Sequence, residues 1–125
     1  MSDVVTEPPG WNANHAPADA AQGTCTVAAS ALGRHVCRHI TITLGGVGAN
    51  AAGVTFVARD GATGAGTIIW TAKLSNLANT SDSISAPVNL VGSKNTAMTL
   101  ESTGAPAASS HVTVAMDGYT DYGPV

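Results

Sequence analysis

Three side chains that can bind a metal ion alternate along one short segment: His35, Cys37 and His39. Alternate residues of a β-strand project from one face, about 6.5–7 Å apart. Imidazole and thiolate are ligands that Zn²⁺ prefers, but a structural zinc site needs four of them. No fourth ligand lies nearby in the sequence. We therefore expect no metal, and instead a polar strip on an outer face, opposite the core-type residues Val36 and Ile40.

The two cysteines of the chain, Cys25 and Cys37, flank a turn-like segment at residues 31–33. In a tight antiparallel hairpin they would lie close enough for a disulfide bond. A reducing cytoplasm would instead keep both as thiols. The sequence leaves both alternatives open and favours free thiols.

Catalytic patterns are missing from the sequence. No serine has the surroundings of a nucleophile elbow, and no Cys–His–Asn set or paired carboxylates stand out in a strand. The segment at residues 64–66 resembles a phosphate cradle only in its glycines, because neither a Lys-Ser/Thr pair nor a helix follows. Four aspartates in turns or near the C-terminus are explained by local backbone hydrogen bonds. We predict a protein that is not an enzyme and carries no cofactor.

Charge is scarce in this chain. Only 10% of its 125 residues are Asp, Glu, Lys or Arg, whereas a typical soluble domain has about 25%. The net charge of −3 and the scattered basic residues argue against nucleic acid as a partner. No apolar run approaches the roughly 20 residues of a membrane helix, and the N-terminus does not read as a signal peptide. Low surface charge is typical of proteins that bury much of their surface in an assembly.

Short alternating segments follow one another from residue 24 onward and indicate β-strands. The expected strands span residues 24–32, 35–44, 54–59, 67–74, 83–91, 96–101 and 111–116. Residues 45–53 and 76–82 are expected to be loops, and Pro87 places its strand at an edge or a bulge. We predict an all-β fold, a single antiparallel β-sandwich of about seven strands. A jelly-roll-like topology is the first choice and an immunoglobulin-like one the alternative.

Residues 1–23 have no strand or helix period, and Pro8 and Pro9 exclude a helix. We predict an extended N-terminal arm, with the sandwich domain at 24–125. The arm would fold back on its own domain, reach a neighbouring subunit or stay mobile, with Trp11 as its anchor. Aromatic and polar residues of this arm and of the C-terminal end are the predicted partner-binding residues: Trp11, Asn12, His15, Tyr119 and Tyr122.

Four stretches in combination carry a resemblance to a known group. They are Arg34-His-Val-Cys37, the run from Val54 through Arg59-Asp-Gly-Ala-Thr-Gly-Ala-Gly to Trp70, Val91-Gly-Ser-Lys-Asn-Thr-Ala-Met-Thr-Leu-Glu101, and Val114 with Gly118-Tyr-Thr. Over roughly residues 10–120 the chain resembles small proteins encoded in the structural-gene regions of tailed bacteriophages and prophages.

This resemblance implies a virion structural component made in the bacterial host cytoplasm. The expected function is that of a capsid decoration (cement) protein on the capsid surface, with the major capsid protein and further copies of itself, as a trimer, for partners. The alternative is a head-fibre or tail adhesin module that binds host-surface carbohydrate. The resemblance implies no catalytic residues.

Overall fold

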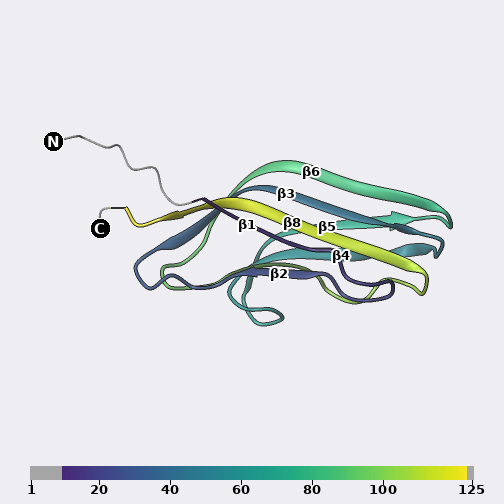
Figure 1. The fold of residues 1–125 in the computed structure, drawn as a ribbon, viewed down its shortest axis with the longest axis horizontal. Coiled ribbons are helices and arrows are strands. Elements are labelled where there is room, and N and C mark those ends of the chain that lie inside the picture. Colours follow the sequence, from purple (N-terminus) through teal and green to yellow (C-terminus); the bar gives the residue numbers. More distant parts are fainter. Residues whose placement is uncertain (1–9, 124–125) are drawn as a thin grey trace.

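Eight β-strands and no helix make up residues 10–123, the part of the chain that the computed structural model describes (Figure 1). The strands are β1 (Gly10–His15), β2 (Thr24–Val27), β3 (Arg34–Gly46), β4 (Asn50–Asp60), β5 (Thr67–Asn76), β6 (Thr80–Val91), β7 (Met98–Ser102) and β8 (Ser110–Asp121). They form two four-stranded sheets: sheet A, in the order β1-β8-β3-β6, and sheet B, in the order β2-β7-β4-β5.

The order of the strands identifies the topology. All neighbouring strands are antiparallel, and β1 pairs with β8, β2 with β7, β3 with β6, and β4 with β5. The first half of the chain thus pairs with the second half as one long hairpin, and this hairpin is rolled so that its rungs alternate between two sheets. Such a rolled hairpin of eight strands is a jelly roll. The predicted all-β sandwich is confirmed, with eight strands in place of about seven.

The core lies between the two sheets and is filled by every second residue of the strands. Ile40, Ile42 and Leu44 of β3 are fully buried, as are Phe56 of β4 and Leu100 of β7. The residues between them on β3 are threonines that face outward. Burial of each large apolar side chain contributes about 1.5–3 kcal/mol, which is the main stabilising term of this sandwich.

The prediction of an extended arm over residues 1–23 was wrong for Gly10–His15, because these residues form β1, a strand of sheet A. Residues Gly10–His15 pair with Val114–Tyr119 of β8 in continuous register, and Figure 1 shows β1 alongside β8. A domain boundary at residue 24 would cut this strand from its sheet. The remaining arm residues 1–9 lie outside the described residues.

Most residues of the two predicted loops belong to strands, and in the first loop two glycines allow a close approach between β3 and β6. Gly45 and Gly46 continue β3 and pair with Ser81 and Thr80 of β6. A Cβ atom on Gly45 would lie 2.7 Å from the Cβ of Ser81, so only glycine fits there. The loop predicted at 45–53 is thereby reduced to residues 47–49, and that at 76–82 to residues 77–79.

Pro87 lies where the sequence predicted it, on an edge strand. It belongs to β6, the outermost strand of sheet A, and pairs with His39 next to a register shift in β3. An edge strand tolerates proline because one side of the strand needs no ladder hydrogen bonds.

Candidate functional site

The predicted polar strip of His35, Cys37 and His39 is not on one face, and this expectation was wrong. A β-bulge between Cys37 and His39 inserts Arg38 as an extra residue relative to β8, where these two residues pair with the consecutive residues Gly118 and Asp117. A bulge reverses the alternation beyond it. His35 and Cys37 therefore face inward, 3% and 0% exposed, whereas His39 faces outward.

The His35 side chain connects two strand ends by hydrogen bonds. Its Nε2 lies 2.7 Å from the carbonyl oxygen of Ala28, and its Nδ1 lies 2.8 Å from Oγ1 of Thr120. Because a carbonyl oxygen only accepts, Nε2 carries the proton and donates, and in the neutral ring Nδ1 accepts from the threonine hydroxyl. Both ring nitrogens are thereby engaged. Among residues 10–123, no three His, Cys, Asp or Glu side chains lie close enough to share a metal ion.

Cys25 and Cys37 are free thiols in the core, on strands of opposite sheets. They are not the two sides of one hairpin, because β2 belongs to sheet B and β3 to sheet A. Burial raises the pKa of Cys25 to about 12 and that of Cys37 to about 11. At neutral pH both are therefore protonated core residues and not nucleophiles.

Because the pKa values of both thiols are raised, we expect the folded protein to lose stability in alkaline solution. The ordinary pKa of a cysteine thiol is 9.0. At a pH between this value and the raised pKa values, the folded state keeps thiol protons that the unfolded chain has released. The free energy of unfolding is therefore unaffected by the thiols below pH 9 and falls as the pH rises above it. We expect urea unfolding to show a loss of about 2–3 kcal/mol at about pH 10 relative to neutral pH.

The matched control is the double variant Cys25→Ala/Cys37→Ala, which lacks both titrating groups. It should be less stable at neutral pH but should lose less of its remaining stability on going to about pH 10. An alkaline loss of the same size in both proteins would assign the effect to groups other than these thiols.

Trp11 and His15, two of the predicted partner-binding residues, face the interior. Trp11 packs against the core, and its ring meets that of His35 edge to face, with centroids 5.9 Å apart. The Nδ1 of His15 accepts a hydrogen bond from the backbone N–H of Thr24 at 3.1 Å, which joins the edges of the two sheets. The arm residues that are described thus fold back on their own domain, one of the three placements that the sequence left open.

Asn12 and Tyr119 lie on the opposite side of sheet A, facing outward. On the paired strands β1 and β8, Asn12 is opposite Asp117 and Gly10 is opposite Tyr119. Tyr122 lies beyond the end of β8, 51% exposed, and its hydroxyl accepts a hydrogen bond from Ser30 Oγ at 2.9 Å. The five predicted residues therefore do not form one site.

The outward side of sheet A forms a surface four strands wide, which we call the outer face of sheet A. Cross-strand pairs such as Thr43 with Thr113 and with Ser83 place their side chains on one face. By register, the face comprises Asn12 and Asn14 of β1, Thr113, Ala115, Asp117 and Tyr119 of β8, His39, Thr41 and Thr43 of β3, and Ser81, Ser83, Ser85 and Pro87 of β6. Asp117 is the one carboxylate among these side chains, and none is Lys or Arg. At the end of the sheet, Arg34 of β3 pairs with Asp121 of β8, and by the same register this pair of opposite charges also faces outward.

Polar groups on this face are largely paired with one another. The hydroxyls of Thr43 and Thr113 are hydrogen-bonded, Thr41 Oγ1 lies 3.3 Å from Ser85 Oγ, and His39 Nε2 lies 2.9 Å from the same Ser85 Oγ. Groups that already have partners lose fewer hydrogen bonds to water when a surface is covered. This face is therefore inexpensive to desolvate, which suits it to contact with another protein surface.

The outer face of sheet B is partly covered by the chain's own turn at residues 61–66, between β4 and β5, which lies against β7 and β4. The Gly64 N–H donates to both carboxylate oxygens of Glu101, at 2.9 and 3.2 Å. Thr99 Oγ1 donates to the Gly61 carbonyl oxygen, and Arg59 Nη1 donates to that of Gly66. Glu101 is only 1% exposed although it faces away from the core. The two sheets thus differ, because the chain's own turn covers part of one outer face and leaves the other open.

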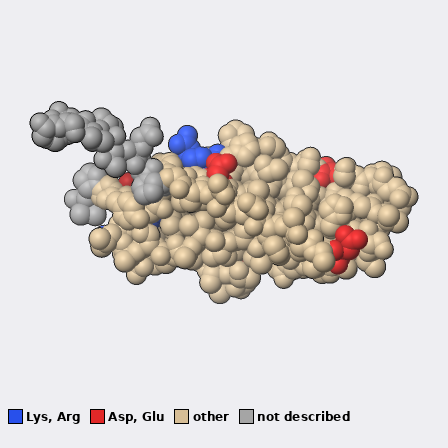
Figure 2. All heavy atoms as spheres, viewed as in Figure 1, with Lys and Arg blue, Asp and Glu red and all other residues tan. Residues whose placement is uncertain are grey.

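Charged side chains are also sparse on the surface that Figure 2 displays, where a blue group with a red group beside it and a few other red groups stand amid wide uncharged areas. Comparison of the chain with protein-family models, with curated proteins and with solved structures finds no match. Residues 10–123 include no helix that is long and apolar enough to cross a membrane.

Proposed function

We propose that this protein is a structural component of a tailed-phage virion, a capsid decoration protein that docks on the assembled shell through the outer face of sheet A. The observation that carries this proposal is the contrast between the two sheets. The turn at residues 61–66 covers part of sheet B, whereas sheet A presents an open face whose central part has a single carboxylate, Asp117. Each unpaired charge buried on docking would cost several kcal/mol, and the central part of this face has almost none to bury.

Two further points support the proposal. The sequence resembles small proteins from phage structural-gene regions over most of its length. Jelly rolls also occur among viral capsid proteins and lectins, although a fold by itself does not define a function. A decoration protein binds only the assembled shell, so its binding free energy adds to the stability of that state. Self-association, with a trimer as the expected oligomer, is part of the same proposal.

Negative charge placed on the outer face of sheet A tests this docking surface. Ser85 lies on the edge strand and Ala115 on the strand next to β1, and both face outward. We expect Ser85→Glu/Ala115→Glu to weaken binding to assembled shells at least about tenfold, because a carboxylate would be buried without a partner. Co-sedimentation of the purified protein with shells that lack it measures this effect.

The matched control is Thr71→Glu, which adds a carboxylate on the exposed outer side of sheet B. It should bind shells as the unmodified protein does. Equal weakening by both variants would point to a general charge effect, and undiminished binding of the double variant would exclude this face as the docking surface.

The alternative, a head-fibre or tail module that binds host-surface carbohydrate, is favoured by one specific feature. A hollow lies at one end of the outer face of sheet A, lined by uncharged polar groups. The copy number of the protein in the virion separates the two functions, because a decoration protein is abundant and a fibre or tail module is scarce.

A further inference from the structure

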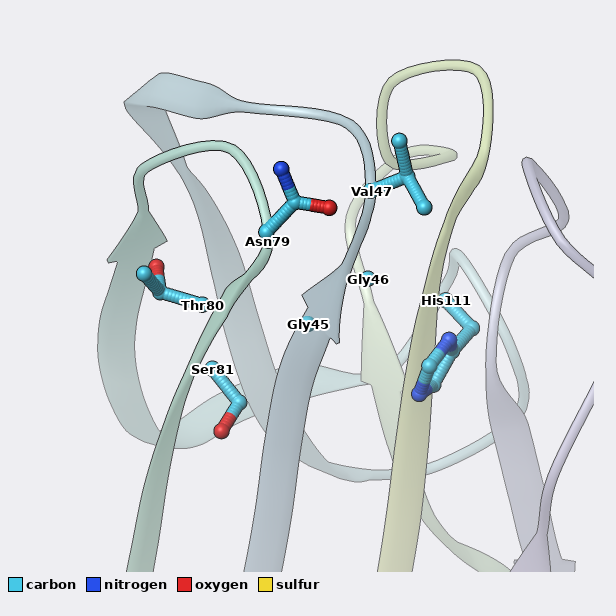
Figure 3. Close-up of a pocket in the computed structure, with 7 residues that line it drawn as sticks. All are labelled: Gly45, Gly46, Val47, Asn79, Thr80, Ser81 and His111. Atoms are coloured by element: carbon cyan, nitrogen blue, oxygen red, sulfur yellow. The ribbon is translucent and has the colours of Figure 1, made fainter.

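A hollow of about 340 Å³ opens where β3 ends, β8 begins and the β5–β6 turn leads into β6 (Figure 3). This volume lies at the lower end of the range of about 300–1,000 Å³ that small-molecule sites occupy. The side chains and glycines that matter for the argument are Gly45, Gly46, Val47, Asn79, Ser81 and His111.

Two consecutive glycines form the floor of the hollow. A Cβ atom on Gly45 would lie 2.7 Å from Ser81 Cβ, and one on Gly46 would lie 2.7 Å from the carbonyl oxygen of Ser109. Gly46 also has a φ of +128°, which an L side chain rarely adopts. The fold therefore requires glycine at both positions, and the backbone floor stays open to a ligand.

The walls carry polar hydrogen-bonding groups on three sides. Figure 3 shows the Asn79 amide across the opening from Val47, with the His111 imidazole and the Ser81 hydroxyl deeper along the strands. Asn79 has a φ of 60°, a conformation that asparagine tolerates, so the turn accommodates this residue at the mouth of the hollow. The amide, hydroxyl and imidazole offer both donors and acceptors.

The rim adds one apolar contact and no cation. Val47 is 64% exposed, an unusual position for a valine, and stands at the edge of the hollow. No Lys, Arg, Asp or Glu is among the lining residues. The carboxylate of Asp19 lies beside the rim, with its Oδ1 3.6 Å from Nδ1 of His111, and makes that side unfavourable for an anion.

We propose that this hollow binds one neutral saccharide unit. The sugar hydroxyls hydrogen-bond to Asn79, Ser81 and His111, and an apolar C–H face of the ring packs on Val47. An anion would find no cationic partner, and a purely apolar ligand would leave the polar walls unsatisfied. The site is independent of shell docking, because it occupies only the end of the outer face.

The test is an NMR titration of the ¹⁵N-labelled full-length protein with glucose, galactose, mannose and N-acetylglucosamine, each by itself. We expect at least one sugar to shift the amide signals of Gly45, Gly46 and His111 saturably, with a dissociation constant on the order of 10 mM for so open a site. Asn79→Gly keeps the positive φ and removes the amide, and His111→Ala removes the imidazole. Each should weaken binding at least about fivefold.

The matched control is Ser83→Ala, on the same strand and face but outside the hollow, and it should bind as the unmodified protein does. Three outcomes overturn the proposal: no saturable shift with any of the four sugars up to about 100 mM, equal affinity in the His111→Ala and unmodified proteins, or tighter binding of glucuronate, which has the same size and a negative charge. Ser85→Glu/Ala115→Glu, which impairs shell docking, should leave sugar binding intact.

Discussion

Removal of residues 1–15 is expected to abolish cooperative folding of the rest of the chain. The deletion takes away all of β1, which covers one edge of the core with Trp11 and Ala13 and pairs along six residues with β8. Truncation of a tryptophan in a core alone costs about 3–5 kcal/mol, against a total stability of about 5–15 kcal/mol for a domain. Circular dichroism and urea unfolding measure the effect.

Two smaller changes serve as controls for this deletion. Trp11→Ala should cost about 2 kcal/mol, less than for a fully buried tryptophan because the side chain is only partly buried. Deletion of residues 1–9 leaves β1 in place and separates its contribution from that of the residues before it. A chain without residues 1–15 that still unfolds cooperatively, at the same urea midpoint, would show that β1 is dispensable and that the domain begins near residue 24.

Glu101→Ala is expected to destabilise the protein by about 3–5 kcal/mol, because it leaves a partly buried cation without its counterion. The Glu101 side chain is 2% exposed, and its Oε1 lies 3.5 Å from Nε of Arg59. Its carboxylate also accepts a hydrogen bond from the N–H of Gly64, so the turn at residues 61–66 loses one of its attachments to β7 and keeps that of Thr99 to Gly61. Urea unfolding measures the loss, and hydrogen exchange at the Gly64 amide should accelerate.

Arg59→Met/Glu101→Leu distinguishes the ion pair from packing. Replacing both charges by apolar side chains leaves no unpaired buried charge, so this double variant should be more stable than Glu101→Ala. Its Gly64 amide should nevertheless exchange faster than in the unmodified protein, because the acceptor is gone. A Glu101→Ala protein that matches the unmodified one in stability would show that the turn is not held by this carboxylate.

The fold class was predictable because the central strands alternate strongly. Ile40, Ile42 and Leu44 of β3 stand between threonines, and this pattern alone indicates a half-buried strand. β1 was missed because only Trp11 is a large apolar residue among its inward positions. Its other inward side chains, Ala13 and His15, give no hydrophobic period, and the strand forms because β8 offers a partner.

The candidate site was less predictable, because it depends on contacts between distant segments. The bulge at Arg38 places His35 and His39 on opposite faces of sheet A, and no local signal in the sequence marks this bulge. Which sheet stays open depends on the turn at residues 61–66 folding over β7, a contact fixed by Glu101 some 37 residues from Gly64. The glycines at 45–46 were identified as loop residues, since the sequence cannot distinguish a flexible glycine from one required by a close approach.

Quantitative mass spectrometry of purified virions from cells that encode this chain tests the proposed function most directly. The measured quantity is the number of copies of this protein per copy of the major capsid protein. We predict a ratio of the same order as one, because a decoration protein occupies repeated positions over the whole shell. Its absence from purified particles, or a ratio a hundredfold or more lower, would contradict a capsid decoration protein.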